Sequence, residues 1–133
     1  MNILFVCKHN RFRSKVAEAL FLHYNKNNKI KVRSAGMQID LMRPFVAESV
    51  HSEINGRGVK MENDQSHSIN PEVLKWADKI IIVADNVGIE DFPKDKVEVW
   101  KIKDTSQEDL KGIKKSVDSI DKKIKILVKR VNV

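Results

Sequence analysis

Residues 2–14 read Asn2-Ile3-Leu4-Phe5-Val6-Cys7-Lys8-His9-Asn10-Arg11-Phe12-Arg13-Ser14, and they contain the only cysteine of the chain. The mainly apolar residues 2–6 predict a short buried strand that ends at Cys7. Apolar residues spaced by three and four positions then predict a helix over residues 14–25. The stretch therefore predicts a Cys-x5-Arg loop that runs from the carboxyl end of a strand into the start of a helix.

Three further apolar runs predict strands over residues 29–34, 79–84 and 96–100. Strands that are apolar on both faces are typical of a parallel sheet covered by helices on both sides. In such a sheet, ligands bind beyond the carboxyl ends of the strands. We therefore expect a single α/β domain over residues 1–133, with a four-stranded parallel sheet, helices on both of its faces and Cys7 at its carboxyl edge.

Local signals predict where the other helices begin. Pro44 is a residue type that can open a helix, and Phe45 would lie on the buried side of that helix. Asn70 followed by Pro71 is the pattern of an N-cap with proline at the first helical position. From Gln107 onward, apolar residues at helical spacing predict a long amphipathic helix that closes the chain.

Composition limits the class of protein. The chain is 41% hydrophobic and 32% charged, as expected of a globular domain, and it has neither a membrane-spanning run nor a signal-peptide pattern. A lone cysteine cannot form an internal disulfide and fits a reducing compartment, so we expect a cytoplasmic protein. No exposed apolar stripe calls for a dimer, so we expect a monomer. The net charge of +7 favours an anionic partner, but the C-terminal lysines fit the solvated face of a helix better than a nucleic-acid stripe.

The Cys-x5-Arg loop has the properties of an oxyanion site. Backbone N–H groups and the dipole of the following helix would converge on one point, where phosphate can bind. Arg13 would add a bidentate grip, and the same positive field favours the nucleophilic thiolate form of Cys7. Ser14 can hydrogen-bond to the sulfur, and Asn10 can hold a left-handed loop conformation. The alternative is that Cys7 is a small buried hydrophobe and Arg13 an ordinary surface residue.

The pattern Val-Cys-x-x-Asn-x-x-Arg-Ser-x-x-Ala-Glu, from Val6 to Glu18, resembles the low-molecular-weight protein tyrosine phosphatases and the related arsenate reductases. Residues 34–36 (Ser-Ala-Gly), residues 82–86 (Ile-Val-Ala-Asp-Asn) and an aspartate after the fourth strand, Asp104, are similar to that family in the same order.

The resemblance implies a two-step phosphoryl transfer that needs no metal or other cofactor. Cys7 attacks phosphorus in line while Arg13 and the loop amides hold the equatorial oxygens. A carboxylic acid protonates the leaving oxygen, and water then hydrolyses the cysteinyl-phosphate with the same carboxylate as base. Asp104 matches the acid of the family. Asp85, the other aspartate that follows a strand, is expected to cap a short helix instead.

The remaining loop residues are expected to bind the substrate: Lys8, His9, Asn10, Arg11, Phe12 and Ser14. Three of them depart from the family pattern. His9 replaces a glycine that permits positive φ, Arg11 replaces a small aliphatic residue, and Phe12 replaces a second cysteine. Lys8, His9 and Arg11 make the rim basic, which favours a multiply charged substrate.

Three functions fit these observations. The first is hydrolysis of a phosphomonoester, carried either by a phosphorylated protein or by a small molecule. The second is arsenate reduction, which would require an external thiol because Cys7 is the only cysteine. The third is a non-catalytic module that binds phosphate or phosphoproteins. His9 motivates that alternative, as does Thr105, which stands where the family has a proline followed by aromatic residues.

Overall fold

The chain folds around a parallel sheet whose strands come from distant parts of the sequence. A computed structural model describes all residues 1–133. The strands are β1 (Asn2–Cys7), β2 (Lys31–Gly36), β3 (Lys79–Val83) and β4 (Val97–Trp100). All pairings are parallel and the order is β2-β1-β3-β4, so β1 is an interior strand and Cys7 lies at its carboxyl end. The predicted α/β fold class is confirmed.

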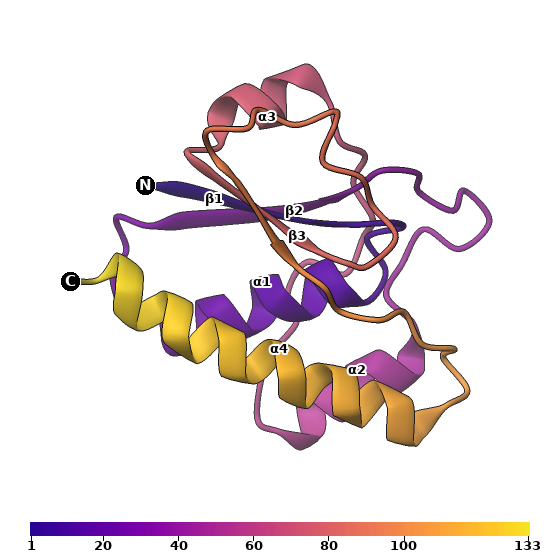
Figure 1. Cartoon of the computed structure of the whole chain (residues 1–133). Coiled ribbons are helices and arrows are strands. Elements are labelled where there is room, and N and C mark those ends of the chain that lie inside the picture. The colour runs from indigo at the N-terminus through magenta and orange to yellow at the C-terminus, as the bar shows by residue number, and fades with distance from the viewer.

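Helices cover both faces of this sheet (Figure 1). They are α1 (Arg13–Tyr24), α2 (Glu48–Gly56), α3 (Pro71–Trp76) and α4 (Leu110–Val131). Side chains alternate along a strand, so β1 contributes to two separate cores. Ile3 and Phe5 pack in the core that contains residues of α1, α2 and α4, whereas Leu4 and Val6 pack in the core that contains Val73 of α3.

The helix predicted to open at Pro44 begins later, at Glu48. The backbone around Pro44 instead pairs with an extended segment: Val46 N–H donates to the carbonyl of Asp64, and Ser66 N–H donates to the carbonyl of Pro44, both at 2.8 Å. Phe45 is 52% exposed, so its predicted burial is wrong. Tertiary hydrogen bonds satisfied the backbone groups that a helix would have used.

The other helix signals had mixed outcomes. Asn70 caps α3 as predicted, and its side chain accepts a hydrogen bond from Val73 N–H at 2.8 Å. The final helix begins at Leu110 rather than at Gln107, with Asp109 as its cap. The helix expected after Asp85 is absent, because residues 84–96 form bends and turns before β4. Asp85 is therefore available for other contacts.

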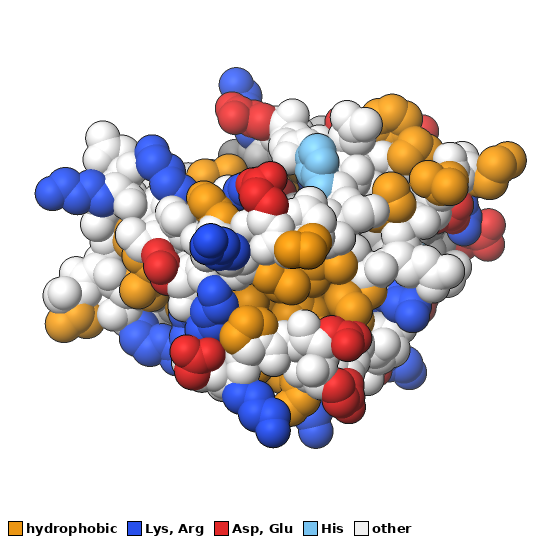
Figure 2. Space-filling view, turned by 90° about the horizontal axis from the view of Figure 1, so that it is seen from above, with side chains coloured by type: hydrophobic (Ala, Val, Ile, Leu, Met, Phe, Trp, Pro, Cys, Tyr) orange, Lys and Arg blue, Asp and Glu red, His pale blue; other side chains and the backbone are white.

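The surface mixes charges of both signs. Figure 2 shows the α3 side of the molecule, where Lys and Arg side chains are interspersed with Asp and Glu. Although the whole chain has a net charge of +7, the Lys and Arg side chains on this face do not form a single stripe. None of the helices combines the length and the apolar character needed to cross a membrane.

Candidate functional site

The loop between β1 and α1 presents a set of unused backbone donors. No N–H group from Lys8 to Phe12 donates a hydrogen bond within the protein. The loop leads directly into α1, which begins at Arg13 and is 12 residues long, so its positive end lies at the same place. Free amides at a helix N-terminus form a ready site for a tetrahedral oxyanion.

Asn10 fixes the shape of this loop. It is the only non-glycine residue with positive φ, at 55°, and its side chain is fully buried. Its amide oxygen accepts from His67 N–H at 2.9 Å, and its amide nitrogen donates to Ser14 Oγ at 2.7 Å. His9 has no positive φ, so the absence of glycine at that position imposes no strain of that kind.

Gly36 lets β2 approach the loop from the side. A Cβ atom on Gly36 would lie 2.8 Å from the carbonyl carbon of His9 and 2.9 Å from the nitrogen of Asn10. Real Cβ atoms do not come this close to backbone atoms, so any side chain here would displace the loop. The glycine that ends the Ser-Ala-Gly run of residues 34–36 is therefore required by the close approach of the loop.

Cys7 sits at the base of the loop with Ser14 beside it. Cys7 Sγ lies 2.9 Å from Ser14 Oγ, and the thiol is 2% exposed. Because Ser14 Oγ also receives the Asn10 amide, the hydroxyl hydrogen is free to point at the sulfur. A hydroxyl hydrogen in that direction can donate a hydrogen bond to the sulfur.

Arg13 is buried, and its guanidinium is held by residues that follow β3 and β4. Its Nη1 donates to the carbonyl of Ile102 at 2.9 Å, and its Nη2 donates to the side-chain oxygen of Asn86 at 3.1 Å. Its side chain is 2% exposed. The guanidinium is therefore fixed next to the loop and is not the surface arginine of the alternative interpretation.

Two aspartates approach Arg13, and only one lines the cleft above Cys7. Asp85 Oδ1 lies 3.5 Å from Arg13 Nη1, and Asp104 Oδ2 lies 3.9 Å from Arg13 Nη2. Asp104 lines the same cleft as Cys7, whereas Asp85 does not. About half of the Asp104 side chain is exposed, so it can reach a leaving group that enters from solvent.

This cleft, which we call the cysteine cleft, has a volume of about 390 Å³. It is lined by both apolar and polar residues: Cys7, His9, Arg11, Phe12, Arg13, Asp40, Arg43, Asp104, Thr105, Ser106 and Gln107. Among the predicted substrate-binding residues, Lys8, Asn10 and Ser14 do not line it. Asn10 and Ser14 instead brace the loop, and Lys8 accepts a backbone hydrogen bond from Gln38 N–H through its carbonyl.

Four residues line the cleft that no sequence pattern singled out: Asp40, Arg43, Ser106 and Gln107. Asp40 and Arg43 follow β2, and Gln107 follows β4. A signal was available, because loops at the carboxyl ends of neighbouring parallel strands converge on one edge of the sheet. No group of three or more His, Cys, Asp or Glu side chains is arranged to hold a metal ion.

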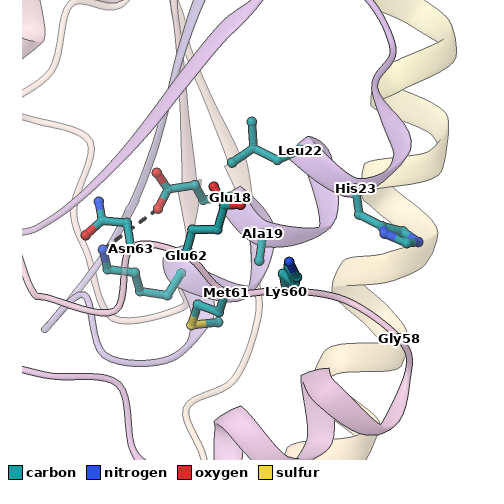
Figure 3. Close-up of a pocket in the computed structure, with 10 residues that line it drawn as sticks. Glu18, Ala19, Leu22, His23, Gly58, Lys60, Met61, Glu62 and Asn63 are labelled. Carbon is teal, nitrogen blue, oxygen red and sulfur yellow. Dashed lines mark ion pairs between the residues drawn. The ribbon is translucent and has the colours of Figure 1, made fainter.

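A larger pocket, of about 550 Å³, lies elsewhere, between α1 and residues 58–63 (Figure 3). Its wall includes the buried ion pair of Lys15 and Glu18, whose Nζ and Oε1 atoms are 3.8 Å apart. It contains no cysteine, and its charged groups are not arranged around a nucleophile. Size alone therefore does not identify the site, and the chemistry favours the smaller cysteine cleft.

Comparisons with known proteins show the family and the fold of this chain. Residues 2–133 match the family described as low molecular weight phosphotyrosine protein phosphatase. A crystal structure of arsenate reductase from Archaeoglobus fulgidus is 30% identical, with a TM-score of 0.77, and the match covers 95% of this chain and 98% of that chain.

Two phosphatase structures show the same fold at lower identity. The YwlE arginine phosphatase from Geobacillus stearothermophilus has a TM-score of 0.86 at 21% identity, covering 98% of this chain and 92% of that one. The low molecular weight protein tyrosine phosphatase from T. tengcongensis has a TM-score of 0.85 at 23% identity, covering 98% and 99%. With the family match spanning nearly the whole chain, this protein belongs to the low molecular weight phosphotyrosine protein phosphatase family.

Proposed function

We propose that the protein hydrolyses a phosphomonoester through a cysteinyl-phosphate intermediate. The observation that carries this proposal is that Cys7 and the buried Arg13 line the cysteine cleft together with loop residues 9, 11 and 12, whose N–H groups have no partner within the protein. Such donors can hold the three equatorial oxygens of a transferring phosphoryl group and stabilise the charge that they carry in the transition state.

In the first step, Cys7 Sγ attacks phosphorus as the bond from phosphorus to the leaving oxygen breaks. We assign Asp104 as the acid that gives its proton to that oxygen, because it lines the same cleft as Cys7 and Asp85 does not. In the second step, water attacks phosphorus, the sulfur–phosphorus bond breaks, and the Asp104 carboxylate takes the proton from water. Ser14 stabilises the thiolate that leaves.

A phosphate-release assay with para-nitrophenyl phosphate tests the reaction. We expect wild-type turnover, complete loss in Cys7→Ser, and a phosphorylated Cys7 peptide by mass spectrometry after rapid acid quenching. Phosphate or vanadate binding without any turnover would contradict the hydrolase and leave a binding module. Turnover that persists in Cys7→Ser would contradict the assigned nucleophile.

The acid is tested by changing the leaving group. Asp104→Ala should lower kcat with phenyl phosphate by about 100-fold or more, the usual contribution of a general acid, and lower it less with para-nitrophenyl phosphate, whose leaving group needs less protonation. Asp85→Ala serves as the competing variant. A leaving-group-dependent loss in Asp85→Ala, with none in Asp104→Ala, would reassign the acid to Asp85.

Arsenate reduction is a second candidate, favoured by the 30% identity to the Archaeoglobus fulgidus arsenate reductase. Cys7 would attack arsenate, and the reduction of arsenic(V) to arsenic(III) would be balanced by oxidation of Cys7 and an external thiol to a mixed disulfide. A second external thiol would then restore Cys7. Arsenite production that depends on added thiol, in the absence of phosphate release from aryl esters, would select this function.

The proposed setting is the cytoplasm, where a lone nucleophilic thiol stays reduced. The proposed partner is a phosphorylated protein or a small phosphomonoester, and the proposed unit of function is the monomer. One domain spanning residues 1–133 would carry the whole reaction.

A further inference from the structure

Arg11 is the cleft arginine that no carboxylate neutralises. Arg13 approaches Asp85 and Asp104, and Arg43 Nε lies 2.9 Å from Asp40 Oδ2, but Arg11 takes part in no ion pair. Its two hydrogen-bond acceptors are neutral oxygens. Arg11 Nε donates to the Phe45 carbonyl at 2.8 Å, and Arg11 Nη1 donates to Gln107 Oε1 at 2.9 Å.

These two bonds fix the guanidinium and leave one edge of it free. Phe45 follows β2 and Gln107 follows β4, so Arg11 is tied to the loops on both sides of the cleft. Its Nη2 group donates no hydrogen bond within the protein, and neither do the two Nη groups of the adjacent Arg43. A planar donor group already held in place loses little entropy when it binds an anion.

Arg11 and Arg43 also repel each other. Partial burial lowers the pKa of Arg11, the nearby charge of Arg43 lowers it further, and Asp40 opposes the shift. A lowered pKa means that the charged form is disfavoured by its surroundings. An anion placed between the two guanidinium groups would relieve this repulsion.

The same cleft offers little to an aromatic ring. Its two hydrophobic lining residues are Cys7 and Phe12, and both are at least 96% buried. Beyond the loop the lining is polar, with Thr105, Ser106 and Gln107 where a ring would need an apolar wall. Binding energy for the organic part of the substrate must therefore come from charge and hydrogen bonds.

We propose that Arg11, with Arg43, forms a second anion-binding subsite in the cysteine cleft, so that the preferred substrate is a phosphomonoester whose organic part carries a second anionic group. This inference rests on the proposed phosphatase function. The phosphoryl group would occupy the loop and Arg13, and the second anion would receive hydrogen bonds from Arg11 Nη2 and from Arg43.

Two isosteric esters test the subsite: meta-carboxyphenyl phosphate and its neutral amide, meta-carbamoylphenyl phosphate. A charge-assisted hydrogen bond contributes enough for the wild type to prefer the carboxylate by about tenfold in kcat/KM. The preference should lie in KM, because a group remote from the reacting centre binds equally in the ground and transition states. Equal kcat/KM values for the two esters in the wild type would overturn the subsite.

Substitutions of Arg11 and Arg43 test whether these two residues cause the preference for the carboxylate ester. Arg11→Gln should reduce the ratio of kcat/KM for the carboxylate ester to that for the amide ester to about one, and Arg43→Gln should reduce it to about threefold, as expected when a charge-assisted contact is lost. Because the ratio is taken within each variant, a general loss of activity cancels. Arg33→Gln is the matched control, because Arg33 is an exposed arginine outside the cleft and should keep the full preference. A tenfold preference retained in Arg11→Gln would overturn the role of Arg11.

The source of the second anion is decided by a peptide pair. A phosphotyrosine peptide with a flanking Glu, compared with the same peptide carrying Gln, should show the same preference if acidic phosphopeptides supply the anion. Preference confined to the aryl esters would place the second anion on a small molecule instead. Either result supports the subsite.

Failure of the proposed function leaves the subsite testable. If neither ester releases phosphate, binding of both esters to the wild-type protein is measured by isothermal titration calorimetry. Tighter binding of the carboxylate ester, lost in Arg11→Gln, would support the subsite in a protein that does not turn over. Equal binding would overturn it.

Discussion

At the scale of single residues, Asn10 combines a left-handed backbone with two buried hydrogen bonds. Asn10→Ala should lower the free energy of unfolding by about 2–4 kcal/mol, because alanine loses both bonds and is strained at positive φ. Asn10→Gly should cost about 1 kcal/mol less, since glycine accepts this φ without strain. Urea unfolding of the three proteins measures both differences, and equal losses for alanine and glycine would contradict the strain argument.

Lys15 and Glu18 form a second buried polar feature in α1. Lys15 Nζ has no hydrogen-bond partner, and Glu18 accepts a bond from Ser34 Oγ at 2.6 Å. Replacing a buried ion pair by well-packed hydrophobic groups of similar volume is often neutral or stabilises a protein by about 1–4 kcal/mol. We expect Lys15→Met with Glu18→Gln to raise the free energy of unfolding at pH 7 by about 1–2 kcal/mol. The control is Lys122→Met on the exposed face of α4, which should change it by less than about 0.5 kcal/mol.

The advantage of this double variant should depend on pH. Burial raises the pKa of Glu18 above its ordinary 4.5, so the wild type loses stability as pH rises from 4.5 through the folded pKa. Burial also lowers the pKa of Lys15 below its ordinary 10.5, so the unfolded chain holds more protons and the wild type regains stability as pH approaches 10.5. Urea unfolding at pH 7 and pH 10 should therefore show a smaller gap at pH 10. A gap independent of pH would contradict burial as the cause.

At the scale of elements, the cysteine loop depends on how closely β2 approaches it. Gly36→Ala would force a Cβ to 2.8 Å from the His9 carbonyl carbon, so either β2 or the loop must shift. We expect a loss of about 1–3 kcal/mol in stability, the usual cost of overpacking. Vanadate should also bind more weakly, because the loop amides would move off their positions.

Gly56→Ala is the matched control for that substitution. A Cβ on Gly56, the last residue of α2, meets nothing within 4 Å and should leave vanadate binding unchanged. Alanine also favours the helical backbone, so stability should rise by up to about 1 kcal/mol. Unfolding curves and vanadate titrations on both variants decide the matter, and equal vanadate affinity in Gly36→Ala and Gly56→Ala would disprove the steric account.

The elements were predictable where local signals agree with tertiary packing. Apolar runs identified the four strands, and Asn70 identified the start of α3, because those signals depend on neighbours in sequence. Pro44 misled the prediction, since its backbone pairs with residues 64–66 rather than with its own next turn. Asp85 misled it for a similar reason: its contact is with Arg13, from which it is separated by 72 residues.

At the scale of the whole molecule, positive charge should make the single thiol selective for anionic reagents. The chain carries a net charge of +7, and Cys7 lies in a cleft with three arginines. For Cys7, the ratio of the alkylation rate by iodoacetate to the rate by iodoacetamide should exceed the same ratio for a small free thiol by about tenfold or more. A cleft lined by positive charge raises the on-rate of an anion by that order. The ratio should fall as salt is added.

Because Cys7 is the only cysteine, alkylation localised to cysteine by peptide mass spectrometry reports on this site alone. Inorganic phosphate should protect the thiol if the loop binds it, and chloride at equal ionic strength is the control. A rate ratio that is insensitive to salt, with no protection by phosphate, would show that the field at Cys7 is not positive.

The sequence by itself determined the strand–loop–helix at residues 2–24, the parallel α/β class and the pairing of Cys7 with Arg13, because each follows from spacing along a short stretch of chain. It also brought Asn10 and Ser14 to the loop. Tertiary structure alone decided that Asp40 and Arg43 line the cleft, and that Arg11 reaches a glutamine 96 residues away. These last contacts depend on how loops from different strands meet at one sheet edge, which no local pattern encodes.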